Sequence, residues 1–384
     1  MVIALTSQPY CPRIAVRRWS ELEFAAGRSA WQSLLRRSAA NPLFMSWEWQ
    51  SRWWRTHHAV LSGELCLLAA YADDGRLVGL APLYRHEAAH RWGPRALRLQ
   101  LLGSTFRGSA PLTFSEYLDF IVDTACEATV MQAFIAHLRA DSEWSDLVVA
   151  QTPVQGLIAR AARTELAPAA YLRWQDGLTA HVLRLPEQFE DYLHALKPGI
   201  RRKVWNRRGR LSAPALVFAH DGEFEGTLQQ IQRFQAARWG GQAQCEGGLG
   251  FHAGFAAAMA RQGALRMSVL VHGGEPISAL YNVELDGTQY NLKSGFSPAA
   301  AALSPSYLHF GYCLEEASRR GVRGFDFLAG DGRSRDYKQD FGAAEVPLVT
   351  LQVIRDPRLQ RLYRLYDGAP GWVRRLGRIK WPRA

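Results

Sequence analysis

The chain has 384 residues, of which 48% are hydrophobic and 21% charged, so it can bury a sizeable core and is long enough for two domains. Its 46 Lys and Arg residues exceed its 35 Asp and Glu residues, and the resulting net charge of +11 favours an anionic partner. The five cysteines show no C-x-x-C spacing, which argues against a disulfide framework and a structural zinc site and favours a cytoplasmic protein.

The N-terminal half opens with an aromatic motif, N-P-x-F-x-S-W-x-W from Asn41, and a helix is predicted from Ser46. No basic leader is present, and the longest apolar run, 65–72, is far shorter than the ~20 residues of a spanning helix. We therefore expect neither a signal peptide nor a transmembrane segment.

A weak internal repeat indicates two domains of one kind. Residues 65–84 align with residues 265–284, and both stretches predict β-hairpins. Helical stretches follow at 126–139 and 306–320, and strands follow these around Asp146 and Asp326. The alternative is chance, because apolar alternation is common in hairpins.

The division is predicted where Pro168 and Gly177 interrupt the periodicity, before a strand from His181. This gives domains at 1–175 and 176–357, followed by a basic tail at 358–384. The second domain begins with a basic helix at 188–211, which Pro198-Gly199 should break. Its cations, among them Arg201, Arg202 and Lys203, either grip the phosphates of a ligand or form a solvated helix face.

The stretch 290–342 combines a strand, a helix, a second strand and a loop. Ser304 suits the N-cap of the helix, Pro305 its first position, and Gly321 its end. Polar candidates for a site lie on both sides of this helix: Tyr290, Lys293, Asp326, Asp331, Tyr337 and Lys338. The chain has no G-x-S-x-G, no G-x-x-x-x-G-K-[ST], no H-E-x-x-H and no grouped metal ligands, so we expect no metal.

These residues resemble the GNAT-like acyltransferases of the CelD/BcsL type, a family named for cellulose biosynthesis and related in fold to the Fem aminoacyl transferases. The resemblance rests on Ser304-Pro305, the run G-x-x-x-x-D-F-L-x-G-D from Gly321, the pair Tyr337-Lys338, the basic run at 197–211 and the opening from Asn41. It implies an α/β (α+β) fold of tandem GNAT-like domains, each a mixed sheet flanked by helices.

The resemblance also implies transfer of acetyl or another acyl group from a CoA thioester to an amine or hydroxyl of a small-molecule or sugar-linked acceptor, as in polysaccharide biosynthesis. Acyl-CoA, such as acetyl-CoA, would be a cosubstrate rather than a tightly bound cofactor. The implied catalytic residues are Asp331, Asp326 and Lys338. The implied substrate-binding residues are Tyr290, Lys293, Ser304, Ser306, Tyr337, Arg201, Arg202 and Lys203.

Several alternatives stay open at this stage. Alanines occupy 299–302 where a glycine-rich Q/R-x-x-G-x-G/A is expected, so the donor could instead be an acyl-carrier protein or an aminoacyl-tRNA. Asp326, Lys338, Lys293 and Tyr290 could have ordinary structural roles. A non-catalytic binding module is the second class of function. The basic, aromatic tail predicts either peripheral contact with the inner membrane or a helix docked on the second domain.

Overall fold

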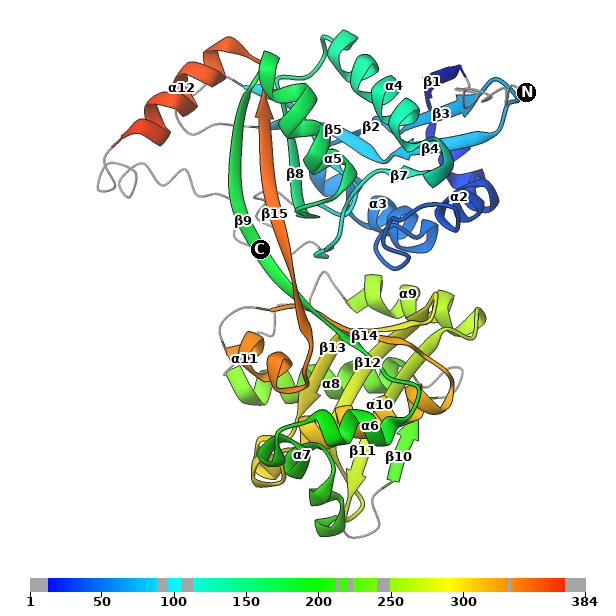
Figure 1. Cartoon of the computed structure of the whole chain (residues 1–384), viewed down its shortest axis with the longest axis vertical. Helices are drawn as coiled ribbons and strands as arrows, with labels where there is room; N and C mark the ends of the chain where they lie inside the picture. Colours follow the sequence, from blue (N-terminus) through cyan, green and yellow to red (C-terminus); the bar gives the residue numbers. More distant parts are fainter. Residues whose placement is uncertain are drawn as a thin grey trace, which may run out of the picture. The chain divides into compact units, whose positions relative to one another are not determined.

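The chain forms two compact units in the computed structural model, which describes residues 13–88, 95–104, 113–211, 215–219, 224–239, 249–330 and 333–369 (Figure 1). Unit 1 comprises Met1–Arg107, Phe114–Gly177 and Val349–Ala384, and unit 2 comprises Gly108–Thr113 and Leu178–Leu348. The division falls inside two strands, β9 (Tyr171–Arg184) and β15 (Ala344–Ile354). β9 thus begins ten residues before the strand predicted at His181.

Unit 1 is a mixed α/β unit. Its helical elements are α1 (Glu21–Ala26), α2 (Arg28–Leu35), α3 (Trp47–Leu61), η1 (Thr124–Cys126), α4 (Glu127–Ala140), α5 (Leu157–Ala161), η2 (Ala162–Leu166), η3 (Ala167–Ala169) and α12 (Pro357–Gly368). Its strands are β1 (Ile14–Arg18), β2 (Glu64–Leu65), β3 (Leu68–Ala72), β4 (Leu77–Ala81), β5 (Leu83–Ala88), β6 (Ala96–Leu101), β7 (Ile121–Val122) and β8 (Asp146–Pro153).

The strands of unit 1 fall into two hydrogen-bonded groups, in the orders β1-β3-β4-β7 and β8-β6-β5-β2. Pro82 separates β4 from β5, because proline has no N–H to continue a ladder. The predicted helix from Ser46 is confirmed, with the Ser46 hydroxyl accepting from the Trp49 N–H. Trp49, Trp53 and Trp54 are buried in the core, whereas Trp47 is only half-buried.

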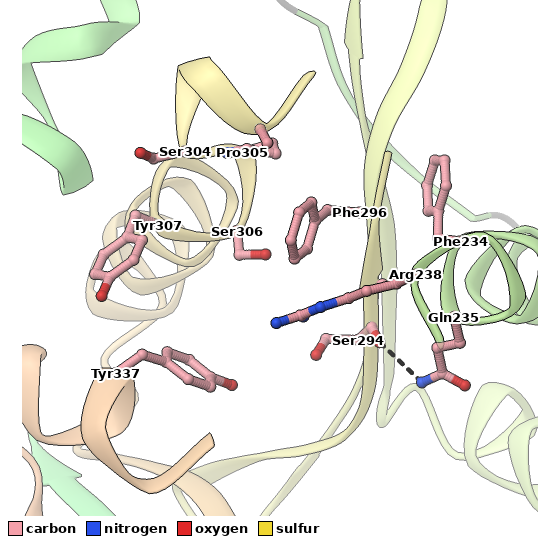
Figure 2. A pocket seen from close by; sticks show the side chains of 12 residues that line it. Phe234, Gln235, Arg238, Ser294, Phe296, Ser304, Pro305, Ser306, Tyr307 and Tyr337 are labelled. Carbon is pink, nitrogen blue, oxygen red and sulfur yellow. Dashed lines mark hydrogen bonds between the residues drawn. The ribbon is translucent and has the colours of Figure 1, made fainter. Parts of the chain in front are cut away.

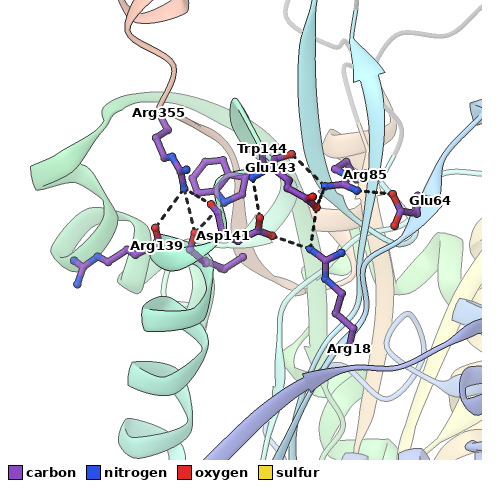
Figure 3. A network of polar contacts seen from close by, with 9 residues as sticks. Arg18, Glu64, Arg85, Arg139, Asp141, Glu143, Trp144 and Arg355 are labelled. Carbon is purple, nitrogen blue, oxygen red and sulfur yellow. Dashed lines mark hydrogen bonds and ion pairs between the residues drawn. The ribbon is translucent and has the colours of Figure 1, made fainter.

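The C-terminal part of unit 1, which begins at Val349, contacts the C-terminal end of α4 through Arg355 (Figure 3). Arg355 directly follows β15. The Arg355 guanidinium donates to the carbonyl oxygens of Asp141 and of Leu138 (3.4 Å) at the C-terminal end of α4. It also lies 4.9 Å from the centre of the Trp144 ring. A cation at this helix end satisfies carbonyls that have no partner within the helix.

Unit 2 has a mixed sheet between helices. Its helical elements are α6 (Phe189–Ala195), α7 (Pro198–Val204), η4 (Asn206–Arg210), α8 (Phe224–Trp239), α9 (Leu249–Arg261), η5 (Pro298–Leu303), α10 (Pro305–Arg319) and α11 (Arg333–Asp340). Its strands are β10 (Ala215–Phe218), β11 (Leu265–His272), β12 (Glu275–Leu285), β13 (Thr288–Phe296) and β14 (Gly324–Gly330). Their order is β10-β11-β12-β13-β14-β9, and only β13 and β14 are parallel among these pairs.

Helices α8 and α10 cover opposite faces of this sheet. Gly295 faces α8, because a Cβ there would meet the backbone of Ile231 at 2.9 Å. The preceding residue, Ser294, is paired with Leu280, which packs with Phe310 of α10. Since successive side chains in a strand alternate between faces, the two helices sandwich β13.

The predicted internal repeat is visible in the secondary structure. β3 and β4 form one antiparallel hairpin, and β11 and β12 form the other. In each half a strand, a helix and a parallel strand follow, as β6, α4 and β8 in unit 1 and as β13, α10 and β14 in unit 2. Two sequence-based details need correction: residues 333–340 form a helix rather than a loop, and the Ser304 side chain does not cap α10.

The basic segment, residues 197–211, is held against α10 by an unusually close contact. The predicted break at Pro198-Gly199 is confirmed, because α6 ends at Ala195 and α7 begins at Pro198. Val204, at the end of α7, is fully buried against Gly311 of α10. A Cβ on Gly311 would lie 2.2 Å from the Val204 carbonyl oxygen, so only glycine allows this approach.

We therefore expect Gly311→Ala to lower the free energy of unfolding by about 1–3 kcal/mol, because the added methyl group overpacks the α7 contact. Helix propensity alone predicts the opposite effect, because Ala stabilises a helix interior by about 1 kcal/mol relative to Gly. Gly226→Ala in α8 is the matched control, since no atom lies within 4 Å of a Cβ there, and it should leave stability unchanged or raised. Urea denaturation measures both, and equal stability of the two variants would contradict the prediction.

Candidate active site

The two parallel strands of unit 2 separate toward their C-terminal ends. β13 pairs with β14 only at Thr288–Tyr290 with Gly324–Asp326. Leu292 interrupts the β12 register as a bulge, since Tyr281 pairs with Lys293 and Asn282 with Asn291. The last six residues of β13 therefore have a backbone edge that β14 does not use, which is the kind of splayed edge that can donate N–H groups to a ligand.

A cavity of about 300 Å³ lies at this end of β13 (Figure 2). Four elements contribute its walls: α8, the end of β13, the turn into α10 with its first residues, and α11. The lining residues are Phe234, Gln235, Arg238, Ser294, Gly295, Phe296, Ala301, Ser304, Pro305, Ser306, Tyr307 and Tyr337. Aromatic walls with a few convergent polar groups are typical of a small-molecule site.

Two features give the cavity a positive character. The first is the N-terminus of α10, a 15-residue helix whose first N–H groups, at Ser306 and Tyr307, have no acceptor within the helix. The second is Arg238, which extends from α8 into the cavity between Phe296 and Ser294 (Figure 2). Its guanidinium lies 4.8 Å from the centre of the Phe296 ring. An anionic group in the cavity would be stabilised from both sides.

Tyr337 of α11 places a phenol in the cavity, facing Ser294 of β13 (Figure 2). Burial raises the pKa of Tyr337 to about 12, although a hydrogen bond with Ser294 and the charge of Arg238 act in the opposite direction. The phenol is therefore protonated at neutral pH and can donate a proton. Gln235 fixes the neighbouring backbone, because its amide donates to the Ser294 carbonyl at 3.0 Å.

The basic segment borders the cavity at two points. The Lys203 ammonium lies 4.8 Å from the centre of the Tyr307 ring, and the Arg207 guanidinium donates to the Ser304 hydroxyl. Ser304 has a φ of 56°, a left-handed conformation that is unfavourable for a residue other than glycine. Arg207 thus braces the strained turn that starts α10. The Tyr307 hydroxyl donates to Asp340 at 2.6 Å. Burial raises the pKa of Tyr307, and this hydrogen bond raises it further.

Two of the predicted catalytic residues brace a kink in β14. The Asp326 carboxylate accepts the Leu328 N–H at 2.7 Å, and the Lys338 ammonium donates to the carbonyls of Leu328 (2.8 Å) and Ala329 (2.7 Å). Leu328 has a φ of 58°, and the register with β9 shifts at this point. Asp326 and Lys338 are both buried. These contacts give both residues a structural task, and a catalytic role for them stays a prediction.

The structure brings together only part of the predicted site. Ser304, Ser306 and Tyr337 line the cavity, and Lys203 contacts its wall. Arg201 and Arg202 lie in α7, Tyr290 and Lys293 in β13, and the described lining includes none of these four. Burial and the charge of Asp326 raise the pKa of Tyr290. Asp331 lies outside the described residues.

Sequence reasoning missed most of the α8 and β13 walls of the cavity. The site residues predicted from the sequence include none of these wall residues: Phe234, Gln235, Arg238, Ser294 and Phe296. Ser294 and Phe296 follow the predicted site residue Lys293 on the strand before α10. Their position at the end of that strand is the signal from which a place in the cavity wall could have been predicted. Nothing in the local pattern of α8 marks its last turns as a cavity wall.

Comparison with protein families finds a match between residues 199–339 and the model of an acetyltransferase (GNAT) domain. This range lies within unit 2 and contains the cavity, most of α11 and all but the first two residues of the basic segment. A comparison with curated protein sequences finds no match. Unit 2 therefore contains a GNAT-like acetyltransferase domain.

Two solved structures share the fold over most of the chain. FemX, at 10% identity, covers 91% of this chain and 99% of its own with a TM-score of 0.62. A conserved protein of unknown function from Bacteroides thetaiotaomicron, at 11% identity, covers 89% and 100% with a TM-score of 0.53. The predicted α/β fold with two GNAT-like domains is confirmed. Membership of the CelD/BcsL type stays a prediction.

Proposed function

We propose that unit 2 is an acyltransferase that holds an acyl donor in the cavity between α8, β13 and α10. The acyl group, acetyl or larger, passes from a thioester to an amine or hydroxyl of a small-molecule or sugar-linked acceptor. The observation that carries the proposal is the placement of the Tyr337 phenol in one cavity with a free strand edge and a helix N-terminus. The GNAT domain match at 199–339 supports the same reaction class.

Each group has a task in this reaction. The acceptor attacks the acyl carbon and loses a proton, the carbon–sulfur bond breaks, and Tyr337 gives its proton to the leaving thiolate. Backbone N–H groups along the free edge of β13 stabilise the oxyanion. The diphosphate of an acyl-CoA fits between the N-terminus of α10 and Arg238. Asp331, by its position after β14, and Asp326 remain our candidates for the base.

The donor we propose is acyl-CoA, with acyl-carrier protein and aminoacyl-tRNA as the alternatives. A phosphate-bearing donor of any of these kinds suits the positive cavity. In the described part of the chain, no helix is long and apolar enough to cross a membrane. The basic tail beyond residue 369 lies outside the described residues, and α12 before it is anchored to unit 1 by Leu359 and Tyr363. Peripheral contact with the inner membrane and a role in polysaccharide biosynthesis stay predictions.

Filling the cavity tests the proposal. We expect Ser306→Phe to lower acyl transfer at least tenfold, because the ring occupies the donor's space beside the α10 N-terminus. The assay follows thiol release from acetyl-CoA in the presence of mixed amine and sugar acceptors. Ser318→Phe, at the other end of α10, is the matched control and should retain activity. An unaffected Ser306→Phe enzyme would contradict the location of the site, and a wild-type protein inactive with every donor class would contradict the function.

A further inference from the structure

The basic segment has more positive charge than its docking requires. Residues 197–211 contain seven cations and no acid: Lys197, Arg201, Arg202, Lys203, Arg207, Arg208 and Arg210. Arg208 forms an ion pair with Glu315 at 2.7 Å and lies between the rings of Trp205 (3.4 Å) and Tyr312 (3.7 Å). Among the residues that the structure describes, no acidic side chain is within ion-pair distance of Arg201, Arg202 or Arg210.

The contacts that dock the segment on α10 and its turn come from other residues. The apolar side of α7 is formed by Ile200 and Val204, which join the core cluster of α10, and Arg207 and Lys203 reach Ser304 and Tyr307. Arg202 and Arg210 are exposed, and Arg201 is half-buried. Unneutralised like charges repel one another and disfavour a compact state, so the fold gains nothing from them.

The segment is also rigidly placed beside the cavity. Val204 is fully buried against Gly311, and Arg207 contacts Ser304 on the cavity wall. A cavity of about 300 Å³ holds on the order of ten water molecules. That is less than a nucleotide-bearing acyl donor requires, so the rest of such a donor must lie outside, along the neighbouring surface.

We infer that Arg201, Arg202 and Arg210 form a phosphate-binding surface that holds the nucleotide part of the acyl donor. The inference rests on the proposed function of the cavity. Arginine suits this task because its planar guanidinium binds two phosphate oxygens at once. Five of the seven cations in the segment are arginines. The phosphates come either from the 3′-phosphorylated adenosine of CoA or from the acceptor end of an aminoacyl-tRNA.

The test compares a triple variant with a charge-matched control. The test protein carries Arg201→Gln, Arg202→Gln and Arg210→Gln. The control carries Arg184→Gln, Arg261→Gln and Arg323→Gln, three exposed arginines of unit 2 outside the segment. Calorimetry gives the Kd of each protein for CoA and for pantetheine, which lacks the nucleotide. We expect the test protein to bind CoA about tenfold more weakly and pantetheine as before, and the control to bind both normally.

An RNA arm distinguishes the two sources of phosphate. If the donor is an aminoacyl-tRNA, CoA binding is unchanged, whereas tRNA binding weakens and the magnitude of the slope of log K against log salt falls by about 0.7 for each lost contact with a single-stranded phosphate. Unchanged affinity for both CoA and tRNA would overturn the inference. So would an equal loss of CoA and pantetheine, which would indicate damage to the cavity. Both of these results concern binding, which is measured without turnover. They can therefore be distinguished from a failure of the proposed acyl transfer.

Discussion

Tyr337→Phe is expected to lower kcat for acyl transfer by about 10²-fold or more, the usual contribution of a general acid, with little change in donor affinity. In the proposed mechanism the phenol supplies the proton that the leaving thiolate takes, and phenylalanine keeps the ring contacts with Phe310 and Phe341. Because burial raises the pKa of Tyr337 to about 12, the group stays protonated throughout neutral pH. The wild-type rate should therefore show no loss from its titration between about pH 6 and 9.

Steady-state kinetics with acetyl-CoA or the active donor measure this effect. Tyr312→Phe is the control, since Tyr312 is on α10 outside the cavity lining and contacts Arg208 through its ring. It should retain the wild-type rate. If Tyr337→Phe retained kcat within about threefold, water rather than Tyr337 would protonate the leaving group, and the assignment of Tyr337 would be wrong.

Asp146→Ala is expected to have the largest effect on stability, a loss of about 3–5 kcal/mol. Asp146 and Arg98 join β8 to β6 inside unit 1, with Arg98 Nη2 at 2.6 Å from the carboxylate, and their side chains are 0% and 1% exposed. Gln352 donates to the same carboxylate at 2.5 Å. Removing the carboxylate leaves a buried guanidinium without its counter-ion, which is far costlier than losing a surface pair.

Guanidinium chloride denaturation followed by tryptophan fluorescence reports this loss. Glu87→Gln breaks the exposed Arg95–Glu87 pair, whose side chains are 84% and 65% exposed, and should cost less than about 1 kcal/mol. The double variant Arg98→Met with Asp146→Leu removes both buried charges and should recover much of the stability. A cost for Asp146→Ala as small as that for Glu87→Gln would show that the pair is not desolvated in solution.

The sequence predicted helix α10 well because its signals are local. Pro305 at the first position, the apolar spacing of Phe310, Leu314 and Ala317, and Gly321 after the last turn all lie within the helix or next to it. The strands of the repeated hairpins were predictable for a similar reason. Their alternation and turns are properties of about 20 consecutive residues, which no distant contact has to complete.

Helix α11 and the cavity were beyond this kind of reasoning. Residues 333–340 read Arg-Ser-Arg-Asp-Tyr-Lys-Gln-Asp, which offers no apolar stripe, so the segment was interpreted as a loop. The Lys338 contact with the Leu328 and Ala329 carbonyls, which helps to fix it, depends on the kink in β14. Likewise, Arg238 and Ser294 line one cavity only because α8 packs across the sheet, and neither local pattern encodes that long-range packing.

The division of the chain also bears on its synthesis by the ribosome. Unit 2 is contained in one stretch, apart from Gly108–Thr113, whereas unit 1 includes Val349–Ala384. In the finished protein β15 lies beside β8, whose residues are almost all buried. At about 5–20 residues per second, residue 349 emerges roughly ten to thirty seconds after residue 177. During that interval the edge of β8 is not yet paired with β15. We therefore expect the nascent first unit to depend on chaperones until β15 has been synthesised, which is after unit 2 is complete.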